Sequence, residues 1–136
     1  MIRVTIGLKG SGKTKKLIDE ANAAIKSEKG DVVCITYSDR LIHDINRKVR
    51  LINTEPFDIK TFDIFGGFIC GIISENYDIT HIFIDSVFKI VKGSMGELDK
   101  FIASLEMLEK QFDVSFTIMV SAELAEATEN VKKYIA

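Results

Sequence analysis

The sequence has little of what marks secreted or disordered proteins. Its 136 residues contain two cysteines, one proline and no tryptophan. Two cysteines cannot build the disulfide framework of small secreted domains, and Cys34 and Cys70 both lie in apolar segments, so we expect buried free thiols. With 46% hydrophobic residues and Pro56 as its single proline, the composition is that of a folded globular chain.

Long hydrophobic runs are also lacking. The longest apolar stretch, FGGFICGII at residues 65–73, is much shorter than the ~20 residues that a membrane-spanning helix needs. The N-terminus passes from Met1 directly into IRVTIG, without the apolar core or cleavage site of a signal peptide. We therefore expect a cytoplasmic protein that does not insert into a membrane.

Neither sign of charge is in excess. The sequence has 18 Lys and Arg residues against 20 Asp and Glu residues, for a net charge of −2. This balance provides no general attraction to nucleic acid or to an anionic membrane. Basic side chains gather locally at residues 40–50, where a solvated helix face is a simpler explanation than a nucleic-acid site. Nucleic acid is therefore disfavoured as a partner.

What the sequence does contain is a regular alternation of strand-like and helix-like apolar spacing. The predicted strands are residues 2–7, 31–37, 49–53, 80–85 and 114–121, with residues 57–60 as the alternative to the third. The predicted helices cover residues 13–30, a short segment capped by Ser38 or Asp39, a segment capped by Thr61, a segment opened by the capping box of Ser94 and Glu97, and residues 122–136. The alternation predicts a single α/β domain over residues 1–136, a three-layer αβα sandwich around a mostly parallel five-stranded sheet.

The predicted third helix is unusual in carrying three glycines, because glycine lowers helix stability. Gly67 and Gly71 lie one turn apart on one face, and Gly66 precedes them. We expect these glycines to allow close packing in the core, with an interface between subunits as the less favoured alternative. A homo-oligomer or another protein partner therefore stays open.

Three of the nine glycines fall within GLKGSGKT, residues 7–14, between a predicted strand and a predicted helix. Gly7, Gly12, Lys13 and Thr14 match G-x-x-x-x-G-K-[ST] in full. Glycine lets the backbone take positive φ and approach a ligand closely, so that successive N–H groups form an anion nest beside the positive end of the helix. Lys13 adds a full charge, which we expect to be exposed in the empty site, and the Thr14 hydroxyl is suited to ligate Mg²⁺.

This segment resembles the Walker A loop of the P-loop NTPases. The resemblance implies a P-loop NTPase fold with a purine nucleoside triphosphate, ATP more than GTP, and Mg²⁺ as cofactors. It also implies that the nucleotide is bound by Gly7, Leu8, Lys9, Gly10, Ser11, Gly12, Lys13, Thr14 and Lys15.

A second motif, HIFID at residues 81–85, ends a predicted strand in an acid. An aspartate at the carboxyl end of a buried strand faces the crevice in which open α/β sheets bind ligands. Asp85 resembles a Walker B aspartate, which would hold Mg²⁺ together with Thr14. The alternative is that Asp85 caps the next helical turn. Asp31 and Asp63 are rivals for the metal, but Asp31 opens its strand and so lies at the opposite edge.

Two further positions bear on turnover. Ser86 follows Asp85, where many hydrolytic P-loop ATPases have a glutamate, so we expect slow hydrolysis or another acid, with Glu97 and Glu123 matching only by position. Ser121 ends VSA, residues 120–122, and resembles the strand-end Ser/Thr of helicase-like cores whose hydroxyl senses the γ-phosphate. Capping of the last helix is an equal alternative for Ser121. Lys13 and Ser121 are thus the expected catalytic residues.

The order of these elements resembles the RecA/helicase-like branch more than the nucleotide kinases, because two predicted strands separate the two Walker motifs. The chain also resembles a small family of clostridial-type ATP-binding proteins, some labelled twitching-motility PilT-like. Twitching motors carry an additional N-terminal domain and further acidic and histidine motifs, for which we expect no room here. Three functions remain: slow ATP hydrolysis, a non-hydrolysing switch or assembly module, and the less favoured small-molecule kinase. A further possibility that stays open is that an arginine of residues 40–50 acts on the nucleotide of a neighbouring subunit.

Overall fold

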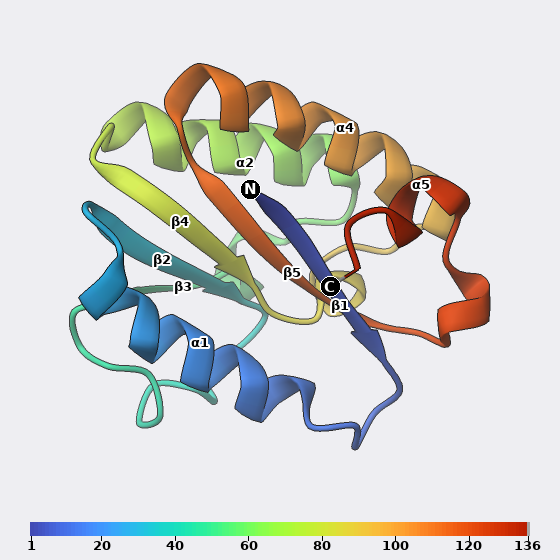
Figure 1. The fold of residues 1–136 in the computed structure, drawn as a ribbon, viewed down its shortest axis with the longest axis horizontal. Helices are drawn as coiled ribbons and strands as arrows, with labels where there is room; N and C mark the ends of the chain where they lie inside the picture. The colour runs from blue at the N-terminus through green and yellow to red at the C-terminus, as the bar shows by residue number, and fades with distance from the viewer. Residues whose placement is uncertain (136) are drawn as a thin grey trace.

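A five-stranded parallel sheet forms the centre of the molecule, in a computed structural model that describes residues 1–135 (Figure 1). The strand order is β1-β5-β4-β2-β3, and every neighbouring pair is parallel. The strands are β1 Ile2–Gly7, β2 Asp31–Thr36, β3 Arg50–Asn53, β4 Ile79–Ile84 and β5 Ser115–Ser121. All five predicted strands are confirmed, and residues 57–60 do not form one.

Helices cover both faces of this sheet (Figure 1). The α-helices are α1 Lys13–Ser27, α2 Phe62–Glu75, α3 Val87–Ile90, α4 Met95–Phe112 and α5 Glu129–Lys132, with 3-10 turns η1 Glu55–Phe57 and η2 Leu124–Glu126. Helix α1 packs on one face through Leu17 and Ala21, and α2 and α4 pack on the other through residues such as Phe65 and Ile102. The predicted α/β architecture with helices in layers on both sides is therefore present.

Alternation along the strands decides which side chains share the α1 face. In β4, Phe83 belongs to the core beneath α1, whereas Ile82 and Ile84 belong to the core beneath α2 and α4. Because successive side chains of a strand point to opposite faces, Asp85 falls on the α1 side, and its N–H continues the ladder by donating to the Ile35 carbonyl at 2.9 Å. The acid therefore stands at the carboxyl edge of the sheet on the same side as the glycine-rich loop.

Two of the predicted helices are wrong. Residues 38–49 form turns and bends instead of a helix. Of the apolar residues expected to share a helix face, Leu41, Ile45 and Val49 are buried, whereas Ile42 is 59% exposed. Asn22 of α1 explains the difference, because its side chain donates to the Asp44 carbonyl and accepts from the Asn46 N–H. These hydrogen bonds hold the segment against α1 in a turn conformation, without the continuous series of i to i−4 backbone bonds of a helix.

The predicted closing helix is also interrupted. Within residues 122–135 only η2 and the one-turn α5 are helical. Thr128 is the N-cap at which α5 begins. The chain then returns to the open edge of β1, where the Val4 N–H donates to the Tyr134 carbonyl at 2.8 Å and Val4 bridges Ile135. Edge pairing with β1 thus replaces further helix.

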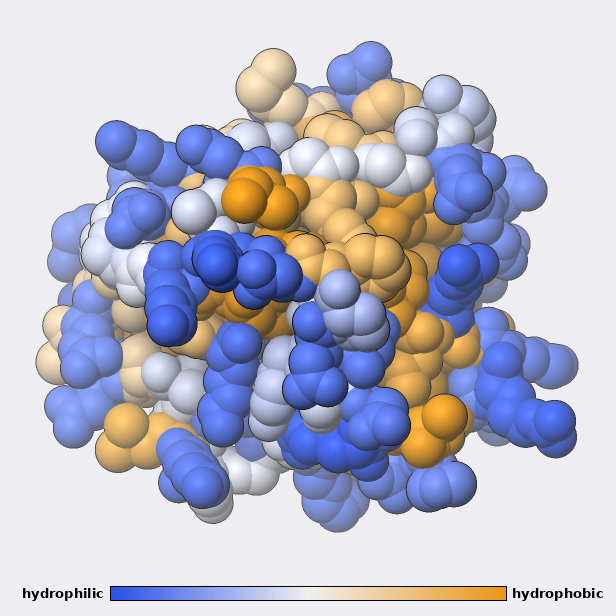
Figure 2. Space-filling view, turned by 180° about the vertical axis from the view of Figure 1, so that it is seen from behind, coloured by the Kyte–Doolittle hydropathy of each residue, from blue (hydrophilic) through white to orange (hydrophobic). Residues whose placement is uncertain are grey.

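The exposure of α2 differs from expectation at its small residues. Cys34 is buried as predicted, but Cys70 is exposed. A Cβ on Gly66, Gly67 or Gly71 would meet no atom within 4 Å, so these glycines do not serve core packing. The view from behind Figure 1 shows apolar residues in the middle of this face with hydrophilic residues around them (Figure 2). An oligomer or a protein partner stays a prediction.

No helix among the described residues is both long enough and apolar enough to cross a membrane.

Candidate functional site

The segment between β1 and α1 is a tight loop built on two glycines with left-handed backbone. Gly10 has φ 89° and Gly12 has φ 87°, a region that residues with side chains rarely adopt. Gly12 is the N-cap of α1, and within residues 1–135 no side chain caps this helix end. The first N–H groups of α1 therefore have no side-chain acceptor, and with the positive end of the helix dipole they suit an anion.

The first glycine of the motif is needed for a steric reason. A Cβ on Gly7 would lie 2.6 Å from the Ser11 hydroxyl oxygen and 3.2 Å from the Ser11 Cβ. The Ser11 N–H also donates to the Leu8 carbonyl at 3.1 Å, which closes the turn. The loop thus folds Ser11 back over the end of β1, and a side chain at position 7 would force it open.

Lys13 is buried, contrary to the expectation that it would be exposed in an empty site. Its residue is 9% exposed, and its ammonium donates to the Leu8 carbonyl at 2.9 Å and to the Ser11 hydroxyl at 3.4 Å. Burial lowers the pKa of Lys13 from its ordinary value, while the Asp85 carboxylate opposes that shift. The charge is therefore held inside the loop by the loop's own oxygen atoms.

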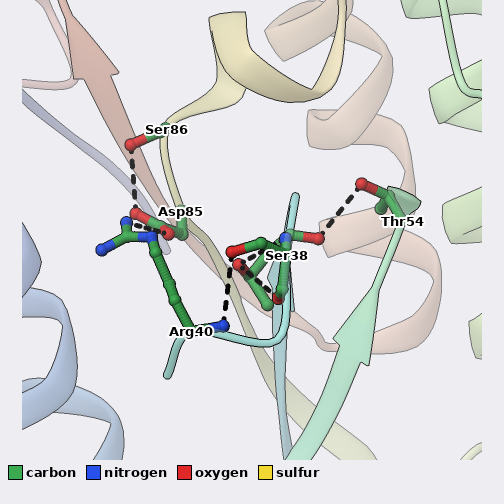
Figure 3. A network of polar contacts seen from close by, with 6 residues as sticks. Ser38, Arg40, Thr54, Asp85 and Ser86 are labelled. Atoms are coloured by element: carbon green, nitrogen blue, oxygen red, sulfur yellow. Dashed lines mark hydrogen bonds and ion pairs between the residues drawn. The ribbon is translucent and has the colours of Figure 1, made fainter. Parts of the chain in front are cut away.

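Asp85 is almost fully enclosed, at 1% exposure, and both carboxylate oxygens have partners (Figure 3). The Arg40 guanidinium donates from Nη2 to Oδ2 at 2.8 Å, and the Ser86 hydroxyl donates to Oδ1 at 3.1 Å. Helix α3 has Ser86 as its N-cap, with no side-chain cap bond in the described chain. Asp85 is therefore the buried member of an ion pair with a partly exposed arginine, which disfavours a role as a simple helix cap.

The Cys34 thiol lies in the core beneath α1, and both members of this ion pair act on its pKa. Burial raises the pKa of Cys34 to about 12, and the Asp85 carboxylate adds to the shift while Arg40 opposes it. A raised pKa keeps the Cys34 thiol protonated at neutral pH, which disfavours this residue as a nucleophile. The charged groups with partners inside the site are Lys13, Arg40 and Asp85.

Ser121 lies directly beside the glycine-rich loop. It is the last residue of β5 and pairs in register with Gly7, and the next N–H, that of Ala122, donates to the Gly7 carbonyl at 3.2 Å. Strand β5 separates β1 from β4, so Ser121 stands between the loop and Asp85 along the sheet edge. The alternative in which Ser121 caps the last helix is wrong, since Thr128 caps α5.

The remaining predicted residues are distributed around the loop. Leu8, Lys9, Gly10, Ser11 and Gly12 are exposed, and Thr14 is half-buried in the first turn of α1. Lys15 points along α1 instead, because its ammonium pairs with Asp19 at 3.0 Å. Glu97 accepts from the N–H and hydroxyl of Ser94, which confirms the capping box and occupies this carboxylate.

Arg40 is the site residue that the sequence did not single out. Five basic or histidine side chains share residues 40–50, and nothing in their spacing distinguishes this one. The available signal is topological: β2 and β4 are neighbours, so the residues that follow each strand meet at one edge. The Tyr37 ring lies 5.1 Å from the Arg40 guanidinium carbon and completes its surroundings.

A metal at this edge could draw only part of its coordination from the protein. Among residues 1–135 no cluster of three or more His, Cys, Asp and Glu side chains could hold an ion. Asp85 and the Thr14 hydroxyl are the hard oxygen donors expected, and Mg²⁺ commonly takes one or two protein ligands with water and substrate phosphate. The two protein donors fit Mg²⁺ when water and substrate phosphate complete its coordination. Binding of the metal to Asp85 also requires the Arg40 guanidinium to move away from the carboxylate.

No protein-family model matches this chain, and no curated protein is similar to it at a significant level.

Proposed function

We propose that the chain binds a purine nucleoside triphosphate, ATP in preference to GTP, together with Mg²⁺. One observation carries this proposal: the loop from Gly7 to Thr14 leads into α1 with two left-handed glycines and encloses a lysine ammonium, on the same sheet edge as Asp85. Backbone N–H groups and a buried cation together suit a polyphosphate better than a neutral ligand or a single carboxylate.

The strand order adds independent support. Strand β5 lies between the strand that precedes the loop and the strand that precedes Asp85, and it brings Ser121 between them. In the family that the loop resembles, an inserted strand with a polar end is the arrangement of the RecA/helicase-like branch. The proposal therefore assigns the chain to that branch and not to the nucleotide kinases.

Each residue then has a defined role toward the bound triphosphate. The N–H groups of residues 8–14 bind the phosphates, and the Lys13 ammonium exchanges the Leu8 carbonyl for phosphate oxygen. Thr14 and Asp85 would hold Mg²⁺, which supplies charge neutralisation along the phosphates. Ser121 orients toward the terminal phosphate from the end of β5. Hydrolysis, where it occurs, is assisted by electrostatic stabilisation of a water attacking in line.

A non-hydrolysing switch is the second candidate, and one local observation favours it. Ser86 occupies the position after Asp85, and its hydroxyl donates to the Asp85 carboxylate. A serine hydroxyl bound in this way cannot take a proton from water at neutral pH. Glu97 is held in its capping box, and Glu123 is exposed as the N-cap of η2, so the proposal includes turnover that is slow at best.

The binding test compares wild type with Lys13→Ala. Titration calorimetry with ATP, GTP and ADP, with and without Mg²⁺, is expected to show triphosphate affinity falling about 10- to 100-fold in the variant, because charge-assisted bonds are lost. Lys26→Ala is the matched control, since it removes the same charge from the far end of α1, ~20 Å away along the axis. Lys26→Ala should bind like wild type.

Two outcomes contradict the proposal. Lys13→Ala with unaltered affinity and an intact circular dichroism spectrum would separate the loop from ligand binding, and wild type that binds no nucleotide would remove the function altogether. Release of inorganic phosphate then discriminates between the two candidates. Turnover above background that disappears in Lys13→Ala favours the ATPase, and nucleotide binding without turnover favours the switch.

A further inference from the structure

The buried carboxylate of Asp85 is paired with the positive charge of the Arg40 guanidinium. Its Oδ2 atom accepts from Arg40 Nη2 at 2.8 Å, and the residue is 1% exposed. An ionised carboxylate removed from water is costly unless a positive group accompanies it. The folded chain is therefore more stable when a cation accompanies Asp85, and Arg40 provides it here.

The two partners differ in their freedom to leave this contact. Asp85 follows β4, and its N–H is fixed to the Ile35 carbonyl of β2. Arg40 lies on the turns that follow β2 (Figure 3). Its side chain is 37% exposed. The guanidinium can therefore move into water at low cost, whereas the carboxylate cannot. Separation of the pair must proceed by movement of Arg40.

We propose that Arg40 is a displaceable counter-ion that a divalent cation replaces on Asp85. This inference rests on the proposed function, in which Asp85 holds Mg²⁺, and it adds the regulation of that site. Arg40 and the metal compete because both are positive and both bind the Asp85 carboxylate, whose Oδ1 atom already accepts from the Ser86 hydroxyl.

Arrival of the metal releases the Arg40 side chain. Asn22 and the buried Leu41 keep the rest of the turn segment 38–49 in place. The state of the metal site is therefore transmitted to the surface next to β2 through the position of the guanidinium.

Competition predicts that removal of Arg40 strengthens metal binding. A site that is open only part of the time has an apparent affinity reduced by its open fraction. If the ion pair is broken in ~10% of molecules, Arg40→Ala is expected to bind a divalent ion about tenfold more tightly than wild type. A purely structural contact predicts the reverse, since loss of Arg40 would then loosen the site and weaken binding.

The test uses Mn²⁺ alone, without nucleotide, and follows free Mn²⁺ by electron paramagnetic resonance. Arg40→Ala should bind about tenfold more tightly than wild type, and Arg40→Ala combined with Asp85→Asn should lose that site. Arg47→Ala is the matched control, because it removes the same charge from the same segment but lines a different cavity, with Asp31 and Glu75. Arg47→Ala should bind Mn²⁺ like wild type.

Thermal unfolding provides a second readout that does not depend on the variant being fully stable. Arg40→Ala alone leaves Asp85 unpaired and should unfold at a lower temperature than wild type, and the double variant should recover part of the loss. Added Mn²⁺ should stabilise Arg40→Ala but not the double variant. Recovery by Mn²⁺ is therefore informative even where Arg40→Ala is unfolded in its absence.

Equal or weaker Mn²⁺ binding by Arg40→Ala, or stabilisation by Mn²⁺ that persists without the Asp85 carboxylate, overturns the inference. Failure of the proposed function has a different signature, because it appears as absence of ATP binding by wild type in calorimetry. If Arg40→Ala binds Mn²⁺ more tightly but wild type has no affinity for ATP, Arg40 remains a displaceable counter-ion, and the proposal of nucleotide binding is rejected.

Discussion

Single residues at the carboxyl edge of the sheet are controlled by how much water reaches them. Asp85 at 1% exposure and Lys13 at 9% exposure are both charged groups in a poorly solvated region. Each is held by a partner that the chain supplies, Arg40 for the acid and the Leu8 carbonyl for the amine. Under the proposed function, a ligand that carries both a metal and phosphates would replace both partners at once.

The same shielding predicts different reactivity for the two cysteines. Cys34 is buried with a pKa raised to about 12, whereas Cys70 lies exposed on α2. Only the thiolate reacts with iodoacetamide or a disulfide reagent. At pH 8 the native protein should therefore take up one label per chain, detected by mass spectrometry, and Cys70→Ser should take up none.

Unfolding is the control for this labelling. In denaturant both thiols should react, so wild type takes up two labels and Cys70→Ser takes up one. Rapid labelling of Cys34 in native Cys70→Ser would mean that the layer between α1 and the sheet opens often, and it would contradict the burial on which the pKa argument depends.

At the scale of secondary-structure elements, α2 contains an avoidable weakness. Gly67 and Gly71 are exposed on the helix, and a Cβ at either position would meet no atom within 4 Å. Glycine in an exposed helix interior costs about 0.5–1 kcal/mol relative to alanine. Gly67→Ala is therefore expected to raise the free energy of unfolding by up to about 1 kcal/mol in urea denaturation.

A matched substitution makes this test specific. Gly93→Ala changes a glycine outside the helices, where the new Cβ would lie 2.8 Å from the Phe62 ring, so it should leave stability unchanged or reduce it. Lower stability in Gly67→Ala would show that the glycine face of α2 has a requirement beyond the packing of a single chain.

Some secondary-structure elements could be predicted from the sequence, and others could not. The strands were predictable because short apolar runs such as IRVTIG and HIFID are typical of strands. Helix starts were predictable because the N-caps Thr61 and Ser94 bond to residues only three positions away. The segment 38–49 has helical apolar spacing, yet the Asn22 side chain, distant in sequence, holds it as turns. Contacts between distant segments have no local signal.

The same distinction applies to the candidate site. Residues 7–14 carry their geometry within one loop, so the positive φ of Gly12 follows from the sequence pattern. The burial of Lys13 and the pairing of Arg40 with Asp85 depend on which strands are neighbours. Sequence spacing places Arg40 and Asp85 far apart, and only the order β4-β2 brings them together.

At the scale of the whole molecule, the sheet has different chemistry at its two edges. The carboxyl edge collects the loop, Asp85 and Ser121. Toward the amino edge, β4 carries His81, which is 5% exposed and shares its Nε2 with the Thr117 hydroxyl of β5 at 2.8 Å. Glu28, which follows α1, lies 3.8 Å from His81 Nδ1. This group joins the sheet to α1 and is the part of the fold that should respond to mild acid.

The pH dependence follows from the surroundings of His81. Burial lowers its pKa from the ordinary value, assisted by Arg3 and the N-terminal ammonium, while Glu28 opposes the shift by charge and hydrogen bonding. A lowered folded-state pKa means that the unfolded chain binds more protons between that value and ~6.5. Stability is therefore expected to be complete above pH ~6.5 and to fall as the pH drops through this window.

Urea unfolding between pH 7.5 and pH 5 checks this expectation for the whole molecule. His81→Gln should have a flatter stability profile than wild type, because a neutral amide can still reach the Thr117 hydroxyl but has no proton to gain. His43→Gln alters the other histidine, which is exposed, and should keep the wild-type profile. A His81→Gln profile as steep as that of wild type would assign the acid sensitivity to carboxylates, and His81 would then contribute packing against Phe83 alone.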